Sequence, residues 1–143
     1  MFERLGKIAK GKVLRMTQEA LANVTRGERV HFFEIYCGCM RLTQSVRALG
    51  MVAPDRLDRE FPLGSHTWNL ALPHDRQLCL ALQDEVDAII THLAPECTHL
   101  CQHTAARNAD RQDEPEVKAA RAQVEFAVTS IRRREEAGAA GSM

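Results

Sequence analysis

The sequence predicts a single α/β domain in which a parallel sheet of about three strands is flanked by helices. Short apolar runs rich in β-branched and aromatic residues alternate with longer segments of helical periodicity. This alternation is typical of β-α-β units, whose right-handed crossovers place strands parallel in one sheet. The 143 residues suit one domain with a real core, and the content of 45% hydrophobic and 27% charged residues is near the globular average.

The first expected element is a basic helix over residues 7–24, which precedes the sheet. Residues 1–30 hold seven basic side chains and three acidic ones, an arrangement that suits either a solvated helix face or a phosphate-binding arm. The inward face of the helix is predicted from apolar residues that can share one side: Leu14, Ala20, Leu21 and Val24.

The next segment has the order strand, tight turn, helix. Val30–Cys37 combines valine, phenylalanine, isoleucine and tyrosine, which favours a buried strand. Gly38 provides the turn, and Arg41–Leu49 has helical spacing, with Gly50 placed to end the helix in a left-handed conformation. We expect a short second strand over Met51–Asp58.

A further helix is predicted to begin near Pro73, which suits the first turn, and a third strand follows over Ala88–Leu93. Pro95 ends that strand. The inner face of the helix is predicted from four apolar residues: Leu78, Ala81, Leu82 and Val86.

The last helix begins at Asp113, which forms a pattern like a capping box with Glu116 around Pro115, and it stops at Gly138. Arg132–Arg134 are interpreted as a solvated helix end. The expected domain organisation has three parts. Residues 1–29 form an N-terminal basic extension, residues 30–138 an incomplete domain with a partial Rossmann-like sheet, and residues 139–143 a disordered tail.

Composition limits the setting and the partners. The five cysteines are an odd, unpatterned set, which indicates free thiols and an intracellular protein of the nucleus or cytoplasm. No apolar run is long enough to cross a bilayer, so no membrane contact is expected. The net charge is zero, so the overall balance gives no support for a dedicated nucleic-acid binder.

Two loops are candidates for a site because ligands of parallel sheets bind at the carboxyl ends of strands. Tyr36–Arg41 follows the first predicted strand, and Leu93–Thr98 includes the end of the third strand and the turn after it. The two loops lie side by side if those strands are neighbours. A single glycine in the first loop suits either an ordinary turn or a nucleotide-binding one.

Several short motifs, in this order and spacing, resemble cytosine-5 DNA methyltransferases, and most closely the methyltransferase-like domains of retroelements. Phe33–Cys39 resembles the first motif of the family, and Phe33–Gly50 its continuation into an Arg-Leu-Thr helix. Trp68–Leu70 and Ala94–Thr98 resemble the later Trp-Asp-Leu and Pro-Pro-Cys-Thr motifs. The resemblance spans roughly residues 30–138.

The resemblance implies an S-adenosylmethionine pocket, with DNA as a possible partner. It assigns cofactor binding to Glu34, Tyr36, Gly38 and Asp58, with Asp55 as the alternative acid for the ribose hydroxyls. It matches Cys97 to the nucleophile that attacks the cytosine ring, a role that suits a thiolate.

Departures from the family pattern predict impaired catalysis. Met40 replaces a second glycine, and Asn69 replaces an acid. Glu96 stands beside Cys97, where a carboxylate disfavours the thiolate. The sequence shows no strand after the last helix, where the family carries the glutamate that grips the flipped base. We therefore expect a truncated domain, with an inert or binding-only retroelement-derived fragment as the alternative and self-association through an uncovered sheet edge.

Two other chemistries use the same cysteine. A small zinc site is the main rival, formed by alternating ligands, although the usual Cys-x-x-Cys spacing is absent. A Cys–His nucleophile pair of Cys97 with His99 or His92 lacks a recognisable third group. The four alternating ligands expected for the zinc site are Cys97, His99, Cys101 and His103.

Overall fold

The computed structural model describes the following parts of the chain: residues 6–35, 41–55, 57, 66, 68–95, 111 and 113–143. The elements, in chain order, are α1 (Lys7–Ala20), β1 (Phe32–Ile35), α2 (Arg41–Ala48), α3 (Pro73–Val86), β2 (Ile90–Leu93), α5 (Pro115–Glu136) and β3 (Ala140–Ser142). The three strands form one parallel sheet in the order β1-β2-β3. The predicted α/β class with a three-stranded parallel sheet is therefore confirmed.

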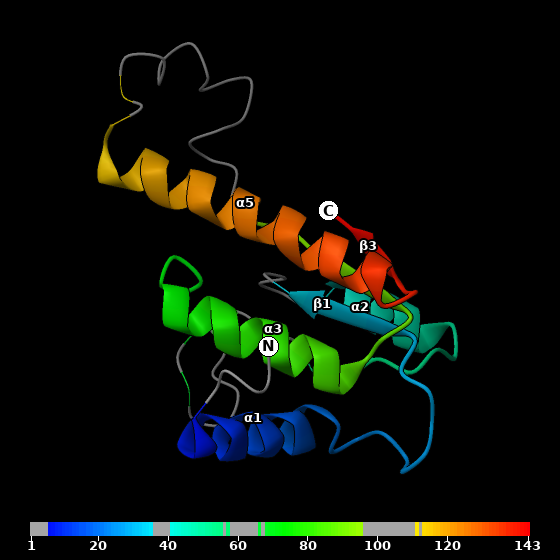
Figure 1. The fold of residues 1–143 in the computed structure, drawn as a ribbon. Coiled ribbons are helices and arrows are strands. Elements are labelled where there is room, and N and C mark those ends of the chain that lie inside the picture. The colour runs from blue at the N-terminus through cyan, green and yellow to red at the C-terminus, as the bar shows by residue number, and fades with distance from the viewer. Residues whose placement is uncertain are drawn as a thin grey trace.

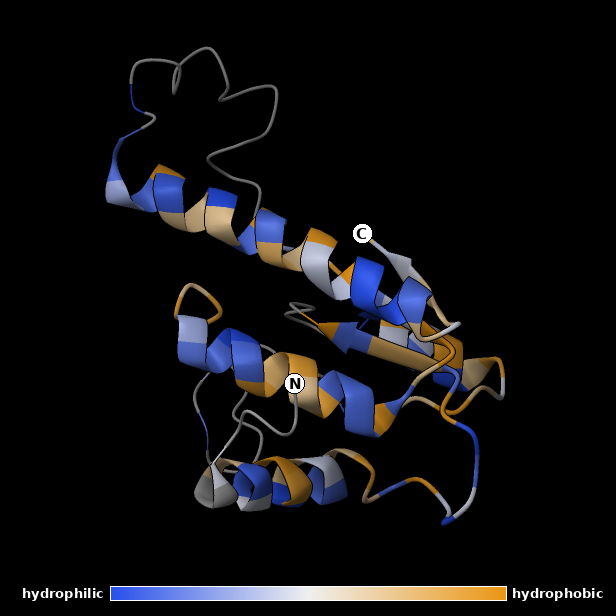
Figure 2. Cartoon of the chain, in the orientation of Figure 1, coloured by the Kyte–Doolittle hydropathy of each residue, from blue (hydrophilic) through white to orange (hydrophobic). Residues whose placement is uncertain are grey.

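The helices cover the two faces of the sheet unequally (Figure 1). α3 and α5 lie on one face, and α1 packs beside α3 in the same layer, whereas α2 is the one described helix on the other face and contacts β1. Figure 2 shows β1 mainly hydrophobic between these layers, while α5 presents much hydrophilic surface to the viewer. None of the described helices is long and apolar enough to span a membrane.

The core lies between the sheet and the layer of α1, α3 and α5. Successive residues of a strand point to opposite faces, so Phe33, Ile35 and Leu93 all point toward these helices, and all three are completely buried. On the other face Phe32 forms a small apolar cluster with one residue of α2 and one of the following segment, Val46 and Ala53.

β1 and α2 follow the prediction closely. β1 occupies the centre of the predicted run, and Gly50 has φ of +81°, the left-handed conformation expected at the end of α2. The strand expected over Met51–Asp58 is wrong for its described part, which runs beside β1 but makes only an isolated bridge, between Ile35 and Leu57. Pro54 has no N–H to donate to a ladder, which explains the interrupted pairing.

The predicted inner face is correct for Ala20, which is buried, and for Leu21 and Val24, which pack against the core, but α1 itself is shorter than expected. It ends at Ala20, and Leu14, predicted to point inward, is 48% exposed. Val13 and Met16 are buried instead, because with Ala20 they form the stripe at helical spacing that faces α3. α3 begins at Pro73 as predicted, and its four expected inner residues are all buried.

The predicted capping box of α5 is wrong. Pro115 holds the first turn, but the N-cap is Glu114, which has no side-chain cap bond. The residue before a proline favours extended backbone, and Glu114 adopts it, with φ of −66° and ψ of 141°. Its carboxylate instead binds the guanidinium of Arg111, with 2.7 Å between Nε and Oε1.

The end of α5 is anchored rather than solvated. Arg134 is 1% exposed, and its Nη2 donates to Asp87 Oδ1 at 2.9 Å and to the Ala88 carbonyl at 2.6 Å. Arg133 donates from Nε to Asp84 at 2.9 Å, and this hydrogen bond raises the pKa of the guanidinium. The two arginines therefore fasten α5 to the end of α3, which the run of charges alone did not reveal.

The predicted disordered tail is also wrong, because Ala140–Ser142 forms β3 beside β2. Gly138 has φ of +81° and turns the chain back after α5. A Cβ on Gly141 would lie 2.9 Å from Cα of Ile131, so only glycine lets the strand approach α5 this closely. An Ala-Gly-Ser strand has little intrinsic β propensity and forms because β2 offers it a ladder.

Candidate functional site

The strand order creates a topological switch point between β1 and β2. From β1 the chain crosses through α2 to the segment ending at Leu57, on one side of β1, and then returns through α3 to β2 on the other side. Ile35 and Leu93, at the carboxyl ends of the two strands, are partners in register, and the Ala94 N–H donates to the Ile35 carbonyl at 3.1 Å. Ligands of open α/β sheets bind in the crevice outside such strand ends.

Glu34 is the one predicted cofactor residue within the described part of the chain. It lies near the carboxyl end of β1, on the face of the sheet that α2 covers. It is 5% exposed, and its Oε2 accepts hydrogen bonds from the N–H of Thr43 at 3.1 Å and from its hydroxyl at 2.6 Å. Thr43 lies in the first turn of α2, where backbone N–H groups lack partners within the helix. The carboxylate therefore fixes the start of α2 at the edge of the crevice.

The other predicted site residues lie outside the described residues. These are Tyr36, Gly38, Asp58 and Cys97, together with Met40, Glu96 and the possible metal ligands His99, Cys101 and His103. No group of three or more His, Cys, Asp and Glu side chains that could hold a metal occurs among the residues that were placed.

The alternative acid, Asp55, serves a different contact. Its carboxylate accepts from Arg47 Nη2 at 3.1 Å, and its N–H donates to the Ala20 carbonyl at 3.2 Å. Asn69, which stands where the resemblance has an acid, accepts the N–H of Ala71 at 3.1 Å and so closes its own turn. Both side chains thus hold local structure near the crevice.

A row of three polar side chains crosses the α2 face of the sheet, near the carboxyl ends of the strands. Glu34, His92 and Ser142 are register partners on three adjacent strands. His92 Nδ1 lies 2.9 Å from Ser142 Oγ, and the ring stacks with that of Phe32 at a centroid distance of 6.4 Å.

Sequence reasoning considered His92 only as a partner for a cysteine and did not place Ser142 in the fold at all. The alternation of Thr91, His92 and Leu93 was the available signal for the side of the sheet on which His92 lies. Ser142 could not be found in this way because its position depends on β3 pairing with β2.

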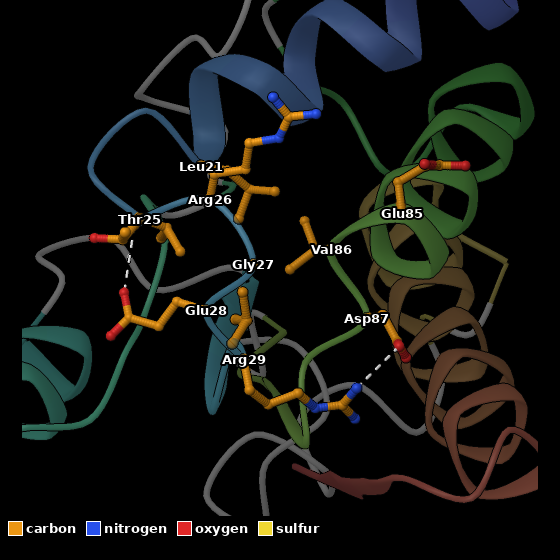
Figure 3. Close-up of a pocket in the computed structure, with 11 residues that line it drawn as sticks. Leu21, Thr25, Arg26, Gly27, Glu28, Arg29, Glu85, Val86 and Asp87 are labelled. Atoms are coloured by element: carbon orange, nitrogen blue, oxygen red, sulfur yellow. Dashed lines mark hydrogen bonds and ion pairs between the residues drawn. The ribbon is translucent and has the colours of Figure 1, made fainter.

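The structure also has a pocket of about 330 Å³ at the other end of the strands, beside the residues that lead into β1 and β2 (Figure 3). It lies between the chain leading into β1, around Gly27 and Val30, and the end of α3 at Val86 and Asp87. In Figure 3 two interactions join residues around it: Arg29 Nη1 lies 3.3 Å from Asp87 Oδ2, and Glu28 accepts the N–H of Thr25 at 3.3 Å. This pocket is distant from the strand ends where the switch point lies.

Comparison with protein-family models, curated proteins and solved structures finds no match for this chain.

Proposed function

We propose that this chain is a methyltransferase-like domain that binds S-adenosylmethionine in the crevice outside β1 and β2. The observation that carries the proposal is the pairing of Ile35 with Leu93, because Gly38 and Cys97 come three and four positions after these two residues in the chain. A cofactor turn and a nucleophile turn must open onto one crevice for methyl transfer, and neighbouring parallel strands satisfy that requirement.

The position of α2 supports the same proposal. Its first turn, held by the Glu34 carboxylate, begins three positions after Gly38 in the chain. The positive end of the helix dipole at such a place favours an anionic group, such as the carboxylate of the cofactor. In this proposal Glu34 acts by positioning α2, and Tyr36, Gly38 and Asp58 contact the cofactor.

β3 removes one objection to a methyltransferase-like fold. The resemblance requires a strand after the last helix, and Ala140–Ser142 provides a parallel strand at that place. We propose that catalysis is nevertheless impaired, because Glu96 beside Cys97 disfavours the thiolate needed for attack on cytosine.

Calorimetric titration with S-adenosylmethionine and with its demethylated product tests cofactor binding. We expect weak binding at one site, reduced about tenfold in Gly38→Val, because a side chain in the turn obstructs the approach of the ligand. Gly11→Val is the matched control, since Gly11 lies on exposed α1 with no atom within 4 Å of an added Cβ. No heat with either ligand at millimolar concentration refutes the proposal.

The catalytic part is tested separately with DNA that contains 5-fluorocytosine, which traps the covalent intermediate of this chemistry. A slow adduct that Cys97→Ser abolishes indicates residual catalysis. Cofactor binding without any adduct indicates a binding-only domain. Fluorescence anisotropy with unmodified DNA, measured at two salt concentrations, tests the proposed DNA partner.

Self-association is a second proposal, supported by the exposed side of the sheet. Ile90 on β2 is 40% exposed although it belongs to a strand, and among the described elements β3 has a neighbour on one side alone. Sedimentation velocity tests this directly: we expect a concentration-dependent dimer that Ile90→Glu dissociates, and a monomer at all concentrations contradicts it.

A further inference from the structure

Three polar side chains form a continuous chain of contacts between α1 and α3. Lys12 Nζ of α1 lies 2.8 Å from His66 Nδ1, and His66 Nε2 lies 2.9 Å from Asp75 Oδ1 in the first turn of α3. The second carboxylate oxygen of Asp75 accepts the N–H of Asn69 at 2.7 Å. The Asp75 residue is only 4% exposed, so these contacts lie inside the interface between the two helices.

The contacts determine where the imidazole carries its proton. An ammonium group has donors and no acceptor, so the nitrogen facing Lys12 must be the unprotonated one. His66 Nε2–H then donates to Asp75. The neutral ring thus connects a cation and a carboxylate that do not touch each other directly.

A second proton on the His66 ring breaks the contact with Lys12 and keeps the contact with Asp75. Protonated Nδ1 would point an N–H at the Lys12 ammonium, placing two donors and two positive charges 2.8 Å apart. The contact between Nε2 and Asp75 becomes an ion pair and is retained. Lys12 has the long, flexible side chain and is the group that must move away.

The described charged groups that face the ring are Lys12 from α1 and Asp75 from α3. Trp68 meets the ring edge-on, with a centroid distance of 4.7 Å, and Cys79 lies one turn further along α3. Burial raises the pKa of the Cys79 thiol, and the nearby charge of Asp75 raises it further.

We propose that Lys12, His66 and Asp75 form a proton-sensitive latch that holds the amino-terminal half of α1 on the segment leading into α3. Protonation of His66 releases Lys12 and loosens that half of α1. The buried stripe of Val13, Met16 and Ala20 keeps the rest of the helix docked. The latch depends on packing in the helix layer alone and is independent of any ligand at the switch point.

The first test is the tautomer of His66, read from long-range ¹H–¹⁵N spectra of the imidazole in the full chain above pH about 7.5. We expect a protonated Nε2 and an unprotonated Nδ1. A protonated Nδ1 at this pH overturns the proposal, because such a ring cannot accept from Lys12.

The second test is amide hydrogen exchange of α1 between about pH 7.5 and about pH 5.5, corrected for the intrinsic pH dependence of exchange. We expect protection of residues 12–16 to fall about tenfold in the wild type, while residues 120–130 of α5 keep theirs. In Lys12→Met the fall disappears, since a protonated His66 then faces Asp75 alone.

Lys118→Met is the matched control, because Lys118 is exposed on α5, and it must behave as the wild type does. An equal fall in Lys12→Met and the wild type overturns the latch, and so does a wild type without any fall. Simultaneous loss of protection in α1 and α5 indicates global unfolding and overturns it as well.

Discussion

The two faces of the sheet are built differently. On the face covered by α1, α3 and α5, the inward residues of β1 and β2 have no exposed surface, and one continuous apolar cluster joins all three helices. On the other face α2 covers β1 through a cluster of three residues, while Ile90 on β2 is 40% exposed. The first face supplies the stability of the domain, and the second leaves surface available at the switch point.

Polar contacts follow the same division. Between α3 and α5, Gln83 pairs with Ser130, and two arginines of α5 hold the end of α3, so these contacts fix two packed helices. On the α2 face the polar groups lie at the strand ends, where Glu34 holds Thr43 and His92 meets Ser142. The polar groups at the strand ends therefore hold α2 and the sheet, whereas those between the helices hold α3 to α5.

The largest expected effect compares two residues of the same strand. Leu93 faces the covered side and is fully buried, so Leu93→Ala should lower the free energy of unfolding by about 3 kcal/mol. Ile90 faces the α2 side, and Ile90→Ala should cost less than about 1 kcal/mol. Urea unfolding measures both, and equal losses would mean that the two faces contribute alike.

The next effect concerns the attachment of β3. Gly141→Ala places a Cβ 2.8 Å from Ile131 Cγ2 and 2.9 Å from its Cα, so the strand or α5 must shift, at about 2 kcal/mol. In Gly11→Ala, by contrast, nothing opposes the added methyl on exposed α1, and stability should rise by about 1 kcal/mol. Thermal and urea unfolding distinguish them, and a neutral Gly141→Ala argues against this packing of β3.

On the α2 face, Thr43→Val removes the hydroxyl that binds Glu34 but keeps the shape of the side chain. Loss of this charge-assisted bond should cost about 1.5 kcal/mol and weaken ligand binding at the switch point. Thr129→Val is the control, because its hydroxyl binds only the Glu125 carbonyl on exposed α5. A Thr43 variant as stable as this control would show that Glu34 does not anchor α2.

The smallest effect is a pH dependence from Cys79. Burial raises the pKa of its thiol, so the folded state keeps a proton that the unfolded chain releases above about pH 8.5. The unfolded state then binds fewer protons, and stability should fall with rising pH, by roughly 1 kcal/mol for each pH unit. Cys79→Val should reduce this slope, measured by urea unfolding at several pH values, and an unchanged slope contradicts the assignment.

Much of the fold followed from local patterns. The run around Phe33, the glycine after α2 and Pro73 at the start of α3 each predicted an element correctly, because strand burial, left-handed turns and first-turn prolines depend on nearby residues. The site was predicted less completely. Glu34 was assigned from the resemblance to the methyltransferase motif, but its bond to Thr43 and the row with His92 and Ser142 required knowledge of which strands are neighbours.

The sequence by itself determined the class of the fold and the order of its main elements, because hydrophobic period and turn residues act within a few positions of the chain. The tertiary structure decided that Ala140–Ser142 is a strand, that Arg134 is buried and that His66 joins α1 to α3. Each of these depends on a partner more than forty residues away in the chain. Their energies come from burial and pairing between distant segments, which no local pattern records.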